Sequence, residues 1–300
     1  MSAASPGALT EVAPAKINLY LHVGGVRQDG LHALESLMVF TGDGDRVAVA
    51  PADDLSLTII GPEAGALARD TLNDNLVLRA ARALKTHARV ESGAAITLNK
   101  RLPIAAGVGG GSADAAAALR ALQKLWALKI DKTALRSIAF RLGADIPACL
   151  ACEPVLVSGA GETLQKGPTL PPLWACLVNP RVATPTGPIF RAYDAENPTP
   201  PAPSAAPMGG VSIAALKSLF DASRNDLERA AIDREPIVAD AIALLSGAPG
   251  AIGARMSGSG ATAFALFSDA ISANRTARRA RAKGLWALAS PIIARLPYDT

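Results

Sequence analysis

A glycine-rich segment that ends in a serine and an alanine run is the first feature of this sequence that could do chemistry. The segment "LPIAAGVGGGSADAAAAL", residues 102–119, carries its glycines at positions 107, 109, 110 and 111. Glycine adopts positive φ and lets a ligand approach exposed backbone amides, at an entropic cost. Ser112 is a suitable N-cap, and the alanines after it favour a helix. Free N–H groups at a helix N-terminus bind anions, so the segment predicts a phosphate site.

Two familiar phosphate-binding patterns do not fit this segment. The Walker A pattern needs a lysine between the last glycine and the serine, but Gly111 directly precedes Ser112. The dinucleotide pattern, started at Gly107, needs glycine or alanine at position 112. Taken alone, the segment is also compatible with a glycine-rich turn before a packed alanine helix.

Two other segments carry polar groups at turns. "SGSGATAFALF", residues 257–267, places Gly258 and Gly260 before a buried strand, and "LGADIP", residues 142–147, places Asp145 between a helical segment and a proline. By themselves, a Ser/Gly turn is typical of an ordinary turn and such an aspartate of a cap or loop.

The segment "AKINLYLHVGG" predicts a strand, because apolar and polar residues alternate along it. Lys16 and Asn18 share its polar face, where a lysine is ordinarily exposed to solvent. The same patterns predict the strands "LESLMVF" and "DRVAVA", joined by a turn at "TGDGD". They also predict strands in "LSLTII", "AAITLNKRLPI", "PVLVSGAGETL" and "ATAFALF".

Helical spacing begins at "NDNLVLRAARALKTHA", with Asp74 as the expected cap and a stripe formed by Leu76, Ala80, Ala83 and Leu84. Further helices are expected in "SADAAAALRALQKLWAL", "SIAALKSLF", "NDLERAAI" and "PIVADAIALLSG", and residues 197–210 read as an extended proline-rich loop. Strands and helices follow one another without regular alternation, so the fold class is α+β.

Composition limits the classes of function. Three hundred residues, half of them hydrophobic, suffice for two domains, and a net charge of +4 does not suggest a nucleic-acid-binding protein. The basic segment "RTARRARAKG", residues 275–284, reads as a solvated helix face. Cys149, Cys152 and Cys176 read as buried reduced thiols rather than metal ligands. The first residues do not resemble a signal peptide and no apolar run reaches the roughly 18 residues of a membrane span, so a cytoplasmic protein with no membrane partner is expected.

Four motifs in order resemble the GHMP superfamily of galactokinase, homoserine, mevalonate and phosphomevalonate kinases: "PAKINLYLHVGGVRQDGLHALES", "LPIAAGVGGGSADAA", "LGADIP" and "MSGSGATAF". Within the superfamily, the chain is most similar to the kinases of 4-diphosphocytidyl-2-C-methyl-D-erythritol, over about residues 13–290. The resemblance implies a ribosomal-protein-S5-like ATP-binding domain at residues 1–165 and a ferredoxin-like domain at residues 166–300, with substrate between them.

The resemblance also implies roles for individual residues. It makes Asp145 the base that accepts the alcohol proton, and Lys16 the cation beside it. The ATP phosphates would be held by Pro103, Ala106, Gly107, Val108, Gly109, Gly110, Gly111, Ser112 and Ala113, with a supporting loop of Ser257, Gly258, Ser259 and Gly260. Asn18, His32, Phe190 and Asp145 would contact the substrate. Ser112 is the candidate protein ligand for Mg²⁺.

Two positions leave open questions. The family commonly has tyrosine before the histidine, where this chain has Leu31, so a stacking partner for the base is missing there. Asp114 lies two residues beyond Ser112, where its carboxylate could face solvent or Mg²⁺.

The activity that the resemblance implies is ATP-dependent phosphorylation of the 2-hydroxyl of 4-diphosphocytidyl-2-C-methyl-D-erythritol, in isoprenoid precursor biosynthesis by the non-mevalonate pathway. The alternatives are another small-molecule kinase of the superfamily, of the homoserine or mevalonate type, and a non-catalytic ATP-binding protein. A structural or nucleic-acid-associated domain of the S5-like fold is disfavoured by the scattered charge. The expected partners are a small-molecule substrate and, at most, a second copy of the chain.

Overall fold

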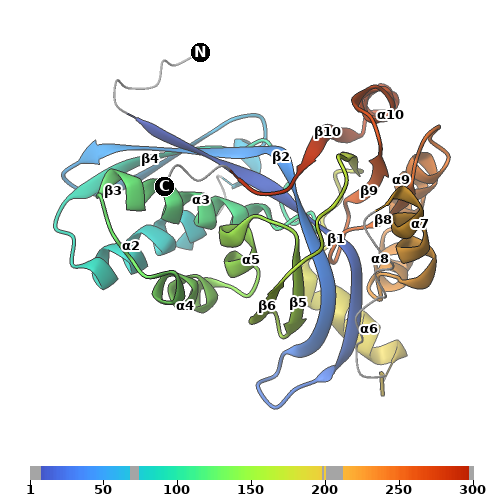
Figure 1. Ribbon diagram of the computed structural model, residues 1–300, viewed down its shortest axis with the longest axis horizontal. Coiled ribbons are helices and arrows are strands. Elements are labelled where there is room, and N and C mark those ends of the chain that lie inside the picture. Colours follow the sequence, from blue (N-terminus) through green and yellow to red (C-terminus); the bar gives the residue numbers. More distant parts are fainter. Residues whose placement is uncertain (1–7, 68–73, 198, 201–211, 297–300) are drawn as a thin grey trace. The chain divides into compact units, whose positions relative to one another are not determined.

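The computed structural model describes residues 8–67, 74–197, 199–200 and 212–296, whose elements are labelled in Figure 1. The chain forms two compact units. The first comprises Met1–Ala15, Asp43–Ile104 and Gly109–Ala151, and the second comprises Lys16–Gly42, Ala105–Val108 and Cys152–Thr300. The boundary expected between residues 165 and 166 lies inside the second unit, and a domain division at that point stays a prediction.

Two long strands pass from one unit into the other along the chain, β1 (Leu9–Val26) and β2 (His32–Ala52), and they pair with each other. The turn expected at "TGDGD" is wrong, because β2 is continuous through it. In the first unit, a Cβ on Gly44 would overlap the carbonyl oxygen of Ala13, and in the second, a Cβ on Gly42 would lie 3.0 Å from Pro291 Cγ. These glycines therefore do not turn the chain. They allow other segments of the chain to approach β2 closely.

The first unit combines a small sheet with five helices. The later part of β2 pairs antiparallel with β4 (Gly93–Asn99), which pairs parallel with β3 (Leu55–Ile60). The helices are α1 (Ala64–Leu67), α2 (Leu76–Ala88), α3 (Gly110–Leu125), α4 (Lys132–Leu142) and α5 (Ile146–Ala151), and Figure 1 shows α2, α3 and α4 on one side of the sheet. The strand expected in "LSLTII" and the helix after residue 75 are confirmed, whereas the segment "AAITLNKRLPI" is strand only as far as Asn99.

The start and the buried stripe of α2 differ from the prediction. Asn75, not Asp74, caps the helix, and its side chain accepts a hydrogen bond of 2.9 Å from the amide of Val77. Leu84 and Ala80 are buried as expected, whereas Leu76 and Ala83 are only half-buried. The chain enters the helix one residue later than expected, so the next short polar side chain reaches the free amides.

The second unit contains a longer antiparallel sheet. The early part of β2 pairs with β5 (Val155–Gly159) and, at its Phe40–Thr41 end, with β10 (Trp286–Ile293), which continues into β7 (Trp174–Asn179), β9 (Ala263–Phe267) and β8 (Gly253–Met256). The single strand expected in "PVLVSGAGETL" is wrong. It is a hairpin of β5 and β6 (Thr163–Lys166), because Gly159 and Gly161 take φ values of 73° and 108° that reverse the chain.

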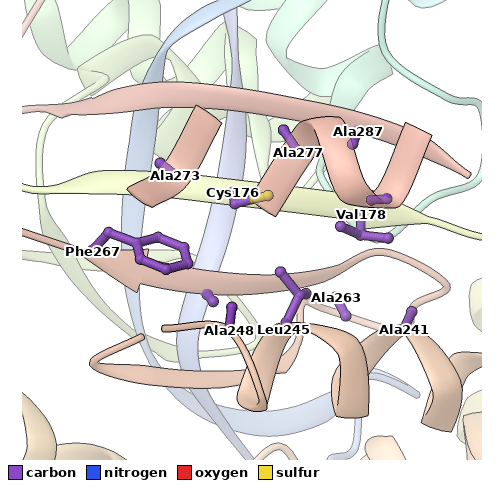
Figure 2. Packing of buried hydrophobic residues seen from close by; sticks show 12 residues of the cluster. Cys176, Val178, Ala241, Leu245, Ala248, Ala263, Phe267, Ala273, Ala277 and Ala287 are labelled. Atoms are coloured by element: carbon purple, nitrogen blue, oxygen red, sulfur yellow. The ribbon is translucent and has the colours of Figure 1, made fainter. Parts of the chain in front are cut away.

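The helices of this unit are α6 (Thr186–Glu196), α7 (Ile213–Ala222), α8 (Glu228–Arg234), α9 (Ile237–Ser246) and α10 (Ala270–Ala282), and the last four confirm or extend the predicted helical segments. α9 and α10 pack against β7 and β9 over a core of mostly small side chains (Figure 2). Alanines at positions 263, 265, 273 and 277 let these layers lie close together. Most of the proline-rich segment expected to be a loop lies outside the described residues.

The thiols and the basic segment have the environments that the sequence predicts. Cys149, Cys152 and Cys176 are buried thiols outside any disulfide, and burial raises the pKa of the Cys176 thiol to about 12. On α10, Arg275, Arg278 and Arg279 are exposed, while the alanine face of the helix is buried, which confirms a solvated basic face. In the described part of the chain, no helix has the length and apolar character needed to cross a membrane.

We expect Gly44→Ala to destabilise the protein by about 2 to 4 kcal/mol, because the new Cβ would overlap backbone that cannot move aside cheaply. Gly25→Ala is the matched control, since Gly25 also lies in a strand but has nothing within 4 Å of its added Cβ. Urea unfolding of both variants measures the difference. Equal midpoints for the two variants would show that the close approach at Gly44 does not constrain the fold.

Candidate functional site

Within the second unit, the first part of the glycine loop lies against the 257–260 turn. A Cβ on Gly107 would overlap the carbonyl oxygen of Ser257, and a Cβ on Gly258 would lie 2.7 Å from the carbonyl oxygen of Gly107. The Ser257 hydroxyl donates a hydrogen bond of 3.0 Å to that same Gly107 oxygen. Both positions therefore require glycine, because the two backbones are in direct contact.

Strand β1 joins this contact through its backbone. The amide of Lys16 donates to the carbonyl oxygen of Val108 at 2.9 Å, and the amide of Asn18 donates to the Ser257 hydroxyl at 3.2 Å. The amide of Thr262 donates to the carbonyl oxygen of Ala106 at 3.2 Å. Three of the four motifs singled out in the sequence thus meet in one unit.

The polar face of β1 is buried, so the reading of Lys16 as an exposed strand lysine is wrong. Lys16 is 5% exposed and Asn18 is 1% exposed. The Asn18 amide nitrogen donates to the Ser36 hydroxyl at 2.8 Å, which in turn donates to the carbonyl oxygen of Tyr20. Burying these groups costs free energy unless they are hydrogen-bonded, so they mark a polar site rather than ordinary core.

The 257–260 turn is held by residues that the sequence did not single out. The side-chain amide of Asn225 donates to the carbonyl oxygens of Met256 and Gly258, at 2.9 and 2.8 Å. The hydroxyls of Ser259 and Thr186 lie 3.1 Å apart. An asparagine in "SRNDLERA" carries no local signal for this role, since its partners follow about 30 residues later.

In the first unit, the second part of the glycine loop begins helix α3. Gly109 is the N-cap, with a left-handed φ of 63°, and the helix starts at Gly110. Ser112 is therefore the third helical residue, and its predicted role as N-cap is wrong. The amide of Ala113 is used inside the helix, since it donates to the carbonyl oxygen of Gly109 at 2.8 Å. The first amides of a helix have no partner within it, so those at positions 110–112 suit an anion.

A buried ion cluster lies beside this helix start. Lys100, which directly follows β4, places its ammonium 2.5 Å from Asp45 Oδ2 and 2.6 Å from Asp114 Oδ2. All three side chains are at most 4% exposed. A Cβ on Gly110 would lie 3.1 Å from Lys100 Nζ, so the ammonium of the cluster lies against the first residue of α3. Asp45 belongs to the segment that was predicted to be a turn, so its pairing with Lys100 was not predicted.

The carboxylate of Asp114 faces Lys100 and not solvent, so the direction of this side chain, which the sequence left open, is known. One ammonium and two carboxylates leave a net charge of −1 when all are ionised. Burial raises the pKa of Asp114 to about 7, with the neighbouring Asp45 adding to the rise and Lys100 opposing it. Among the described residues, Asp114 Oδ1 is one of four buried side-chain atoms without a hydrogen-bond partner.

Asp145 directly precedes helix α5, and its carbonyl oxygen accepts from the Cys149 amide at 3.0 Å. Asp145 is half-buried. Arg120 of α3 links α5 to β1 in this unit, since it donates to the carbonyl oxygens of Cys149 and Val12 at 3.1 and 2.6 Å. Asp145 and Lys16 belong to different units, and their pairing stays a prediction.

The residues expected at the base end of the substrate meet in the second unit. The rings of His32 and Phe190 have centroids 4.6 Å apart. His32 Nε2 lies 2.7 Å from Asp194 Oδ1, a partner that the sequence analysis missed. Leu31 is 48% exposed beside them.

Comparisons with known proteins assign the family. Residues 75–153 match the model of the GHMP kinase N-terminal domain, and residues 212–284 match that of the GHMP kinase C-terminal domain. A 4-diphosphocytidyl-2-C-methyl-D-erythritol kinase of Cereibacter sphaeroides is 49% identical over 91% of this chain and 95% of its own. One of Paramagnetospirillum magneticum is 46% identical, over 88% and 91%. The chain belongs to this family of GHMP kinases.

A solved structure agrees with this membership. A crystal structure of a 4-(cytidine 5'-diphospho)-2C-methyl-D-erythritol kinase is similar with a TM-score of 0.78 and 34% identity, and the match covers 95% of this chain and 99% of the other. The predicted α+β fold with GHMP kinase N- and C-terminal domains is thereby confirmed.

We expect Asp114→Asn to stabilise the protein more at pH 8 than at pH 5. The raised pKa means that the folded state favours the protonated carboxyl. A stabilising contribution that is fully present below the ordinary aspartate pKa of 3.8 is therefore lost as the pH rises from there to about 7. Asparagine removes that charge, so we expect a gain of about 1 to 3 kcal/mol at pH 8. Thermal unfolding between pH 5 and pH 8 measures it.

Asp53→Asn is the control for Asp114→Asn, because Asp53 is an exposed aspartate of the same unit. Its effect on stability should not change over this range. Parallel pH profiles for Asp114→Asn and the unmodified protein would contradict the assignment of a near-neutral pKa to the buried carboxyl.

Proposed function

We propose that this protein transfers the γ-phosphoryl group of ATP to the 2-hydroxyl of 4-diphosphocytidyl-2-C-methyl-D-erythritol, giving the 2-phosphate and ADP. The observation that carries the proposal is the high identity to kinases of that name over nearly their whole length. The contact of the glycine loop with the 257–260 turn and with β1 supports it, because it gathers residues of three motifs. The reaction belongs to the non-mevalonate route to isoprenoid precursors.

The proposed chemistry assigns one step to each polar group. Asp145 accepts the proton of the attacking hydroxyl as the new P–O bond forms. Lys16 supplies positive charge beside the reacting oxygen, and Asn18, on the same buried face of β1, orients the substrate. The bond between the γ-phosphorus and the bridging oxygen breaks, and ADP leaves with the electron pair.

The start of α3 fits the phosphates of ATP. Gly109 in the left-handed region turns the amides of positions 110–112 out of the preceding loop, and no side chain at 110 or 111 obstructs them. The other proposed loop residues, from Pro103 to Val108, would line the same phosphates. Asp114 is held by Lys100 and is not placed as a metal ligand.

Mg²⁺ is expected to bind mainly through phosphate oxygens and water. Within the described ranges, no group of three His, Cys, Asp or Glu side chains could hold a metal ion. Ser112, in the first turn of α3, remains the proposed protein ligand. When bound, the ion would neutralise charge on the transferred phosphoryl group.

We expect Asp145→Asn to abolish ADP release, with a loss of at least about 100-fold in kcat, because the amide cannot accept the proton. The assay uses purified protein with ATP, Mg²⁺ and the cytidylyl substrate. Homoserine and mevalonate in the same assay test the other kinases of the superfamily. ATP binding by calorimetry without turnover of any of these alcohols would favour a non-catalytic ATP-binding protein and overturn the proposal.

We expect Leu31→Tyr to lower the KM for the cytidylyl substrate about three- to tenfold, because an aromatic ring at this exposed position would stack on the base. The KM for ATP should not change. An unchanged or higher KM for the cytidylyl substrate would show that Leu31 does not lie at the stacking position.

A further inference from the structure

One face of helix α6 holds His32 in two different ways. Phe190 and Asp194 are four residues apart on this helix, so their side chains project from the same face. Phe190 packs against the imidazole ring at a centroid distance of 4.6 Å and an angle of 40°. Asp194 Oδ1 lies 2.7 Å from Nε2 of the same ring. The two contacts fix both the plane of the imidazole and its rotation within that plane.

The helix that makes these contacts is itself anchored. The hydroxyl of Tyr193, one residue before Asp194, donates a hydrogen bond of 2.6 Å to the carbonyl oxygen of Val23 in β1. Tyr193 and Ile189 are buried in the same hydrophobic cluster as Val23. Asp194 is therefore carried by an anchored segment of the helix.

The main chain just before His32 is held by its own hydrogen bonds. The amide of Arg27 donates to the carbonyl oxygen of Leu31 at 2.7 Å, and the amide of Leu31 donates to Asp29 Oδ1 at 3.0 Å. His32 is the first residue of β2. The link to Asp194 thus restrains the His32 side chain at the point where the loop becomes strand.

We propose that Asp194 is a positioning residue for the cytosine end of the substrate, acting through His32. The inference rests on the proposed function, in which His32 and Phe190 contact that base. A carboxylate acceptor makes a stronger hydrogen bond than a neutral group. The His32 side chain is 12% exposed, so its ring is largely shielded from water, although the Asp194 side chain is 40% exposed. Without the carboxylate, the ring is free to rotate away from Phe190, and the base subsite has to be ordered when substrate binds.

The test is the kinetics of Asp194→Ala and Asp194→Asn. We expect Asp194→Ala to raise the KM for the cytidylyl substrate about five- to tenfold, with kcat and the KM for ATP within twofold of the unmodified enzyme. Asparagine keeps an oxygen that can accept from Nε2–H, so Asp194→Asn should return the KM to within about twofold. Binding of cytidine 5'-diphosphate, measured by calorimetry, should weaken by the same factor in the alanine variant.

Two controls separate positioning from a general loss of structure. Glu196→Ala removes an exposed carboxylate from the same helix and should leave every constant unchanged. In a His32→Ala background, Asp194→Ala should cause no further rise in KM, because it acts through that ring.

The outcomes distinguish this inference from the proposed function. Normal turnover by the unmodified enzyme together with an unchanged KM and an unchanged affinity for cytidine diphosphate in Asp194→Ala would overturn the positioning role alone. An equal fall in kcat for all substrates, with no rescue by asparagine, would also overturn it. No turnover by the unmodified enzyme, with no binding of cytidine diphosphate, would overturn both.

Discussion

In the second unit, the backbone at Gly107 is in direct contact with the backbone of the 257–260 turn. The placement of the polar residues around them depends on this contact. No Cβ fits at Gly107 or Gly258, and the Ser257 hydroxyl bridges the two segments while also accepting from β1. A side chain at either glycine would separate the turn from the loop and from the strand that carries Lys16. Glycine is therefore needed here for close packing, in addition to any contact with a phosphate.

The parts of the fold that could be predicted are those in which the signal is local. The alternation in β1 and β3 and the spacing in α2 and α9 depend on residues within one element, and these elements occur where expected. The turn predicted from the glycines at positions 42 and 44 is wrong. These positions need glycine because another segment of the chain, distant in sequence, packs against each of them. The same holds for β5 and β6, where two glycines reverse the chain inside an otherwise regular apolar run.

The site shows the same division between local and long-range information. Glycine loops and the order of the motifs were readable, and the structure brings His32 to Phe190 and Asn18 to Ser257. Lys100, Arg120 and Asn225 were not readable, since each bonds to groups distant in sequence and none stands in a distinctive pattern. A buried lysine after a strand and an arginine in an alanine-rich helix become informative only when their partners are known.

The electrostatics at the start of α3 limit which groups can attract the phosphate that is proposed to bind there. Lys100 is the lysine below Gly110, but two carboxylates balance its charge, so it adds no net attraction for an anion. The attraction must come from the amides at positions 110–112 and the helix dipole. A phosphate there would favour the protonated form of Asp114, because the ionised cluster carries an extra negative charge below the same helix turn. Lys100 therefore links the first turns of α3 to the end of β4. The cation proposed for the reaction is a different lysine, Lys16.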